Sequence, residues 1–179
     1  MKQVLIPKAL QEMLGERQSI GSMASILLFG AILSIAAVMR FPDMYDGIPL
    51  WQRVLSFLLI FDIFCGCIAN FTESTNNYYA ARHKMRLLFI AVHVHIVVLA
   101  LLLETDVMNA VWVWLYTIVS AFVINGLTGP RQRFVGGLLL AGGLGWVPML
   151  PNMELFTLIV SLLFMLKVLY AFSVNHYAK

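Results

Sequence analysis

Residues 54–72 read VLSFLLIFDIFCGCIANFT, an apolar run interrupted near its middle by one acidic residue, Asp62. A helix needs about 20 mostly apolar residues to cross a bilayer, so this run predicts a membrane-spanning helix. An ionisable side chain inside such a helix is costly, and it generally pairs with another polar group or serves a functional site. The run therefore predicts a membrane protein whose polar chemistry centres on Asp62.

The composition supports a membrane-embedded chain. Of the 179 residues, 61% are hydrophobic and 12% are charged, whereas a soluble domain has about 25% charged residues. So much apolar surface requires lipid around it, and the length predicts one integral membrane domain over residues 1–179. We expect it in the plasma membrane. The net charge of +3 is explained by positive loops, so no nucleic-acid partner is predicted.

Six segments have the length and apolarity of a span or come close to them. A head of residues 1–20 precedes them. Its residues 7–18 form either a short helix lying on the cytoplasmic membrane surface or a loose tail, since so short a helix is marginal without burial. The third and fourth spans are so close that residues 104–106 must form a tight hairpin. The predicted fold is thus an all-α polytopic bundle of six transmembrane helices, at residues 21–39, 54–72, 87–103, 107–126, 134–150 and 155–173.

The loop charges orient these six spans. Only Arg40 and Arg53 lie on one side. Nine lysines and arginines lie on the other: Lys2, Lys8, Arg17, Arg82, Lys84, Arg86, Arg131, Arg133 and Lys179. Because cytoplasmic loops carry the excess of positive residues, this partition places both termini in the cytoplasm.

Polar residues continue from Asp62 along one face of the predicted second span. On a helix with about 100° per residue, Gly66, Asn70, Glu73 and Asn77 all fall within about 80° of Asp62. The result is a stripe of carboxylate and amide groups that runs from mid-membrane to the cytoplasmic end. The helix either continues past the membrane along this stripe or breaks in residues 72–79, where Ser, Thr and Asn compete for backbone hydrogen bonds.

Three further polar residues reach a similar depth. His93 and His95 lie in the third span and Lys167 lies in the sixth, all within about 9–13 Å of the cytoplasmic ends of their helices, against about 15 Å for Asp62. On a continuous helix His93 and His95 point to different faces, and we expect His93 to face the interior. No metal or cofactor site is predicted, because the two histidines diverge.

Three interpretations of this polar group remain open. Asp62 and Lys167 form a structural ion pair; or Asp62, Asn70, Glu73, Asn77, His93, His95 and Lys167 form a binding site for a small solute or ion; or the group performs acid–base chemistry on a lipid. No HExxH, GxSxG or HxxxH pattern is present, so no catalytic residue is assigned. We favour binding or transport, with a lipid enzyme or a structural, partner-binding protein as the alternatives.

Two other features bear on packing and partners. The fifth span contains Gly136, Gly137, Gly142, Gly143 and Gly145. One interpretation is that these glycines allow close helix packing, inside the bundle or between the subunits of an oligomer. The alternative is a broken helix that lines a cavity. The basic inner loops are the candidate contacts for anionic lipid, through Arg82, Lys84, Arg86, Arg131 and Arg133.

Overall fold

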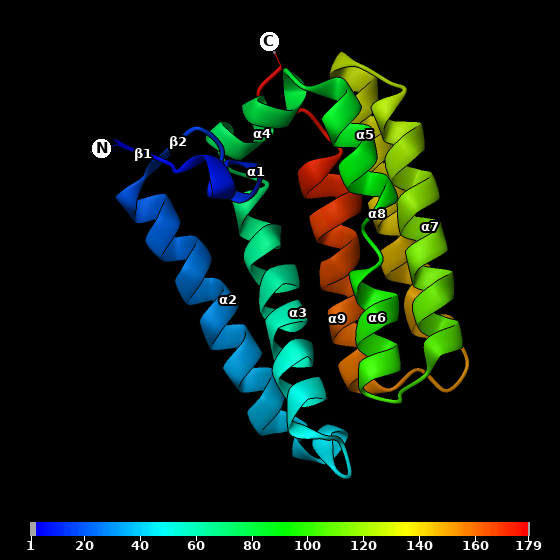
Figure 1. Cartoon of the computed structure of the whole chain (residues 1–179). Coiled ribbons are helices and arrows are strands. Elements are labelled where there is room, and N and C mark those ends of the chain that lie inside the picture. The colour runs from blue at the N-terminus through cyan, green and yellow to red at the C-terminus, as the bar shows by residue number, and fades with distance from the viewer. Residues whose placement is uncertain (1–2, 179) are drawn as a thin grey trace.

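The computed structural model describes residues 3–178, and it is built almost wholly from helices (Figure 1). Five helical stretches are long and apolar enough to cross a membrane: Ile20–Arg40, Leu50–Ala69, His83–Leu102, Val107–Asn125 and Leu155–Phe172. They correspond to α2 (Ile20–Arg40), α3 (Leu50–Ala69), α5 (His83–Ala91) with α6 (His95–Leu102), α7 (Val107–Asn125), and α9 (Leu155–Met165) with the π-helical segment η4 (Leu166–Phe172). By their length and composition, these helices are those of an integral membrane protein.

A further long helix, α8 (Gly129–Trp146), lies beside α7 (Figure 1). It covers most of the predicted fifth span but is less apolar than the others, because its glycines and its first turn with Arg131, Gln132 and Arg133 dilute the leucines. Helices α2 and α3 form an antiparallel pair, and α3 packs against α6, α9 and η4. Both ends of the described chain lie near α4 (Glu73–Ala80), at the same end of the bundle (Figure 1).

Two of the predicted spans differ from the observed helices in a way that matters for the site. The second ends at Ala69, three residues early, and the third is split between α5 and α6. The predicted hairpin before α7 is confirmed: Glu104 has a φ of 53°, and the Asp106 carboxylate accepts a hydrogen bond from the Asn109 amide at 3.1 Å. That bond caps the first turn of α7.

The chain turns sharply after α3. Thr72 leaves the helix with extended backbone angles and its hydroxyl accepts from the Thr75 amide, so it caps the new helix α4. This is the break that competing hydroxyl and amide side chains favour. Helix α4 then crosses the end of the bundle instead of continuing α3 (Figure 1). The polar stripe predicted along one straight helix is therefore divided at residue 70.

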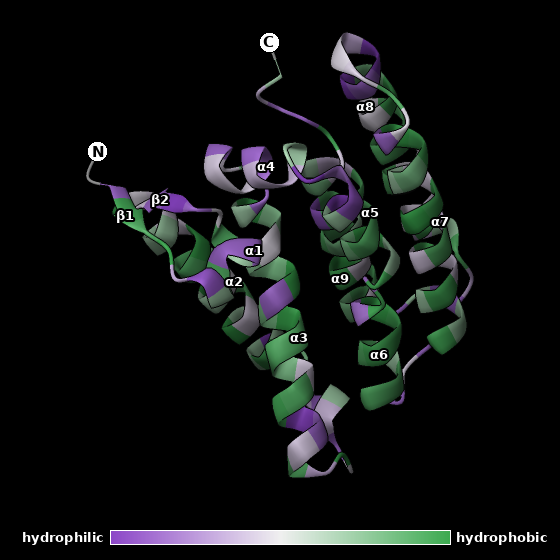
Figure 2. Ribbon diagram, turned by 45° about the horizontal axis from the view of Figure 1, so that its top comes forward, coloured by the Kyte–Doolittle hydropathy of each residue, from purple (hydrophilic) through white to green (hydrophobic). Residues whose placement is uncertain are grey.

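The head contains a two-stranded antiparallel sheet that the sequence did not predict. Strands β1 (Gln3–Leu5) and β2 (Arg17–Ser19) pair with each other, and the short helices η1 (Lys8–Leu10) and α1 (Gln11–Leu14) lie between them. The predicted helix over 7–18 is therefore shorter. The Tyr79 hydroxyl of α4 donates to the Glu12 carbonyl at 3.0 Å, which holds the head against α4. Figure 2 shows the hydrophilic colour gathered on the head and α4 and the hydrophobic colour on the long helices.

The glycine-rich helix α8 is continuous, and two of its glycines allow close packing. A Cβ at Gly136 would lie 2.7 Å from Val174 Cγ2, and one at Gly143 would lie 2.7 Å from Met165 Sδ. Small residues at such positions let the neighbouring segment approach. The packing interpretation of this span is confirmed for these two glycines, and the interrupted helix occurs elsewhere, between α5 and α6. Two shorter helices complete the chain, η2 (Pro42–Tyr45) and η3 (Val147–Met149).

Candidate functional site

The site is built around a direct ion pair between α3 and η4. Lys167 Nζ donates to Asp62 Oδ2 at 2.6 Å and also approaches the Asp62 carbonyl at 3.3 Å. Lys167 is 3% exposed, whereas the Asp62 side chain is 34% exposed. The ion pair predicted from the sequence is therefore present. One side of the carboxylate is open, so the pair does not use the full binding capacity of Asp62.

The residues that follow Asp62 at the end of α3 hold Lys167 in place. Gly66 leaves room for the lysine stem, since a Cβ there would lie 2.3 Å from Lys167 Cε. Asn70 is buried and its amide donates to the Lys167 carbonyl at 3.3 Å. The first three residues of the predicted stripe thus share one function, which is to position the lysine.

Lys167 lies in a π-helical segment, and π-helical turns often occur at functional sites. Widening the helix frees carbonyl groups, which must find other donors when they are buried. Side chains supply them: besides Asn70, Arg86 donates to the Phe172 carbonyl at 2.6 Å and Ser173 donates to the Val168 carbonyl at 2.8 Å. The irregular backbone is therefore stabilised by specific side chains.

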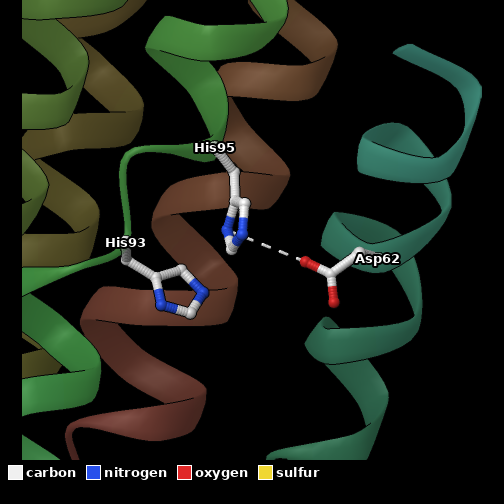
Figure 3. Close-up of side chains that lie close together, drawn as sticks. All are labelled: Asp62, His93 and His95. Carbon is white, nitrogen blue, oxygen red and sulfur yellow. Dashed lines mark ion pairs between the residues drawn. The ribbon is translucent and has the colours of Figure 1, made fainter. Parts of the chain in front are cut away.

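The interruption between α5 and α6 brings two histidines into the same region (Figure 3). Their ring centroids are 4.6 Å apart at an interplanar angle of 90°. His95 Nδ1 lies 3.8 Å from Asp62 Oδ2, shown by the dashed line in Figure 3. The expectation that the two rings diverge was wrong, because it assumed a continuous helix.

His93 explains why the helix stops here. Its Nδ1 lies 3.0 Å from the Phe89 carbonyl, the group that the His93 amide would use in a regular α-helix. The amide instead donates to the Ile90 carbonyl at 3.2 Å, so a side chain has replaced the backbone donor and broken the ladder. His93 is 2% exposed, which confirms that it faces the interior, although its neighbour His95 is the residue nearer to Asp62.

One potential ligand atom each from Asp62, His93 and His95 lies within 4.8 Å of the others. Such a group can bind a cation or pass a proton between carboxylate and imidazole. Among the described residues, His93 Nε2 and His95 Nδ1 are buried and have no hydrogen-bond partner. Sequence reasoning named the residues of this group but missed the helix break that assembles them; the segment contains no Gly or Pro that would have signalled it.

Two predicted site residues lie elsewhere. Glu73 and Asn77 are on α4 and line a pocket of about 830 Å³ between the head and α4. Arg82 borders the same pocket and pairs with Glu16 at 2.7 Å. The turn at Thr72 separates this pocket from Asp62, so the seven predicted site residues form two groups.

The basic loops are not uniformly available to lipid. Lys84, Arg131 and Arg133 are exposed, and for these the anionic-lipid contact stays a prediction. Arg86 is only 5% exposed and is committed to the Phe172 carbonyl, so it does not belong to that surface.

Comparison with known proteins adds no assignment. No family model, curated protein or solved structure matches this chain. The function is therefore inferred from the geometry of the group formed by Asp62, Lys167, His93 and His95.

Proposed function

We propose that this chain binds a small solute or ion at Asp62 and carries it across the membrane. The observation behind the proposal is a polar cluster that lies where two helical stretches depart from α-geometry. These are the break between α5 and α6 and the π-helical segment η4. Interrupted helices frame the binding sites of many transporters, because unwound backbone there lines the site. The chemistry favours a cation, since the groups that come together here are one carboxylate and two imidazoles.

A structural ion pair by itself accounts for Asp62 and Lys167 but not for the histidines. A buried polar atom without a partner costs about 1–3 kcal/mol. A cluster that only stabilised the fold would gain from replacing the unpaired His93 Nε2 with an apolar group. Here two such nitrogens lie close to a partly exposed carboxylate, and this combination supports a ligand-binding role.

The topology that goes with this function has six spans, with α8 as the fifth. The chain lies in the plasma membrane with both termini in the cytoplasm. Support comes from the nine-to-two partition of basic loop residues and from the two chain ends lying near α4. Reporter fusions test it: a cytoplasm-active reporter on either terminus should be active, and one placed in the loop at Asp46 should not. Activity at Asp46 would reverse the orientation.

Transport is tested by reconstituting the purified chain into proteoliposomes on a solid-supported membrane. Rapid exchange of Na⁺, K⁺, Zn²⁺ or choline should give a current for at least one of them, and Asp62→Asn should abolish that current. Glu73→Gln is the matched control, because it removes a carboxylate that lies in the separate pocket. No current from any of these cations, or an equal loss in both variants, would refute transport at Asp62.

The structural alternative is supported by the Asp62–Lys167 pair. It predicts that Asp62→Asn lowers the stability of the folded chain while the wild-type protein gives no cation current. The same two preparations therefore decide between a binding site and a purely structural pair.

A further inference from the structure

We propose that the ion is a divalent transition metal of the zinc class, bound by His93, His95 and Asp62, and that Lys167 occupies Asp62 until the metal displaces it. This inference rests on the proposed function, because it names the ion for the same site. It concerns equilibrium binding, and transport is a separate measurement.

His93 already has the arrangement of a metal ligand. A carbonyl oxygen can only accept, so Nδ1 at 3.0 Å from the Phe89 carbonyl must carry the proton. Nε2 then holds a free lone pair. Metal-binding histidines generally donate their other ring N–H to a carbonyl or carboxylate, which fixes the tautomer and the ring orientation. In His93 this second interaction is in place, and Nε2 is buried without a partner among residues 3–178.

His93 is also held rigidly. Its ring packs against Phe89 at a centroid distance of 4.2 Å and lies 6.3 Å from the ring of Phe164. A ligand fixed by neighbouring rings loses little conformational entropy when the metal binds. The site therefore has one preorganised ligand.

His95 and Asp62 are the adjustable ligands. Their side chains are 32% and 34% exposed, and Oδ2 lies 3.8 Å from Nδ1. Ligand atoms around tetrahedral zinc are roughly 3.3 Å apart, given metal–ligand bonds of about 2.0–2.2 Å. The three ligand atoms, which lie within 4.8 Å of one another, therefore need to approach by at most roughly 1.5 Å. Rotation of the two partly exposed side chains would provide this movement.

The ligand types select the class of metal. Two imidazoles and one carboxylate suit Zn²⁺, Co²⁺, Ni²⁺ and Cu²⁺, whereas Mg²⁺ and Ca²⁺ prefer oxygen ligands throughout. Three protein ligands also leave a fourth position open. An open position allows an ion to arrive and leave.

The Lys167 ammonium group stabilises the fold through its ion pair with Asp62 but opposes metal binding. With Lys167 charged and both histidines neutral, the ion pair makes the cluster neutral; a divalent ion added beside the ammonium would suffer strong repulsion at low dielectric constant. The metal must therefore replace Lys167 at Asp62 Oδ2. It follows that removing the lysine charge should strengthen metal binding while removing the carboxylate weakens it.

The test uses untagged protein in detergent, with Zn²⁺ followed by calorimetry and Co²⁺ by visible absorption. Wild type should bind one metal and give the intense bands of tetrahedral Co²⁺, with no binding of Mg²⁺. His93→Phe keeps the aromatic packing but removes Nε2, and should weaken Zn²⁺ by more than about 100-fold. His176→Phe, a histidine outside the cluster, should leave the affinity unchanged. Lys167→Met should tighten Zn²⁺ by roughly tenfold or more.

Several results would overturn the inference. They are octahedral Co²⁺ bands in the wild type, unchanged Zn²⁺ affinity in folded His93→Phe, or weaker Zn²⁺ binding in folded Lys167→Met. The wild-type spectrum decides the matter even if a variant fails to fold. A wild type that binds no Zn²⁺ but gives an Asp62-dependent Na⁺ current removes the metal and leaves the proposed function. Tight Zn²⁺ binding without any current supports the metal site and refutes the proposed transport function.

Discussion

Replacing Gly66 by alanine gives a direct test of how tightly the cluster holds Lys167. The new Cβ would lie 2.3 Å from Lys167 Cε and 2.7 Å from its Cδ. Both contacts are far shorter than van der Waals separation, so the lysine stem must move. That movement breaks the 2.6 Å hydrogen bond to Asp62, while nothing else in α3 needs to change.

The magnitude follows from two opposing terms. Losing a hydrogen bond between charged groups costs about 1.5–3 kcal/mol, and the lower half of that range applies because one-third of the Asp62 side chain is exposed. Alanine in a helix interior gains about 1 kcal/mol over glycine. The net expectation is a loss of about 1 kcal/mol. Gly137 in α8 has no atom within 4 Å of its would-be Cβ, so Gly137→Ala should gain about 1 kcal/mol.

The two variants should therefore differ by about 2 kcal/mol, a factor of roughly 30 in the unfolding equilibrium. Unfolding in mixed micelles of increasing SDS fraction, followed by circular dichroism, measures this difference. In a Lys167→Ala background the contact is removed, so Gly66→Ala should then behave like Gly137→Ala. Equal stability of the two single variants would refute the conclusion that Lys167 is pinned against α3.

Three further predictions concern the frame around the site. Gly143→Leu should unfold the bundle or markedly destabilise it, because its Cβ would overlap the Met165 sulfur and the Tyr116 ring. Gly145→Leu should be tolerated, because no atom lies within 4 Å of its would-be Cβ. The SDS titration compares the two variants. Burial lowers the pKa of His176 below its ordinary 6.5, so below about pH 6.5 the unfolded chain binds a proton that the folded chain does not, and stability should fall with the pH. His176→Phe should flatten that dependence, and an unchanged slope would contradict it. Asp106→Ala should cost about 1 kcal/mol by removing the α7 cap on the Asn109 amide, with Asp106→Asn retaining most of the stability.

Much of the helical frame was readable from the sequence. Apolar runs of about 20 residues are a local property, and the starts of α2, α7 and α9 fall within one residue of their predicted positions. The Asp62–Lys167 pair was also predictable, since intramembrane charges at similar depth tend to meet. The break before α4 was one of the two alternatives left open for residues 72–79. The expectation failed at residues 92–94, where a continuous helix was assumed, because competition between side chains and backbone for hydrogen bonds depends on three-dimensional context.

The sequence by itself determined that this chain is a membrane-type helical protein with an unusual acidic residue in its second long helix, because hydrophobicity and charge are carried by each residue wherever it lies. Only the tertiary structure decided which polar residues share a site. The Phe89 carbonyl interacts with the His93 side chain instead of the His93 amide. The helix is interrupted there, and His95 lies close to Asp62 as a result. The turn capped by Thr72 placed Glu73 and Asn77 in the pocket beside the head, away from Asp62. Both outcomes depend on which buried carbonyl or amide finds which partner in the packed fold, and the apolar runs, charges and helical spacing of the sequence do not reveal that choice.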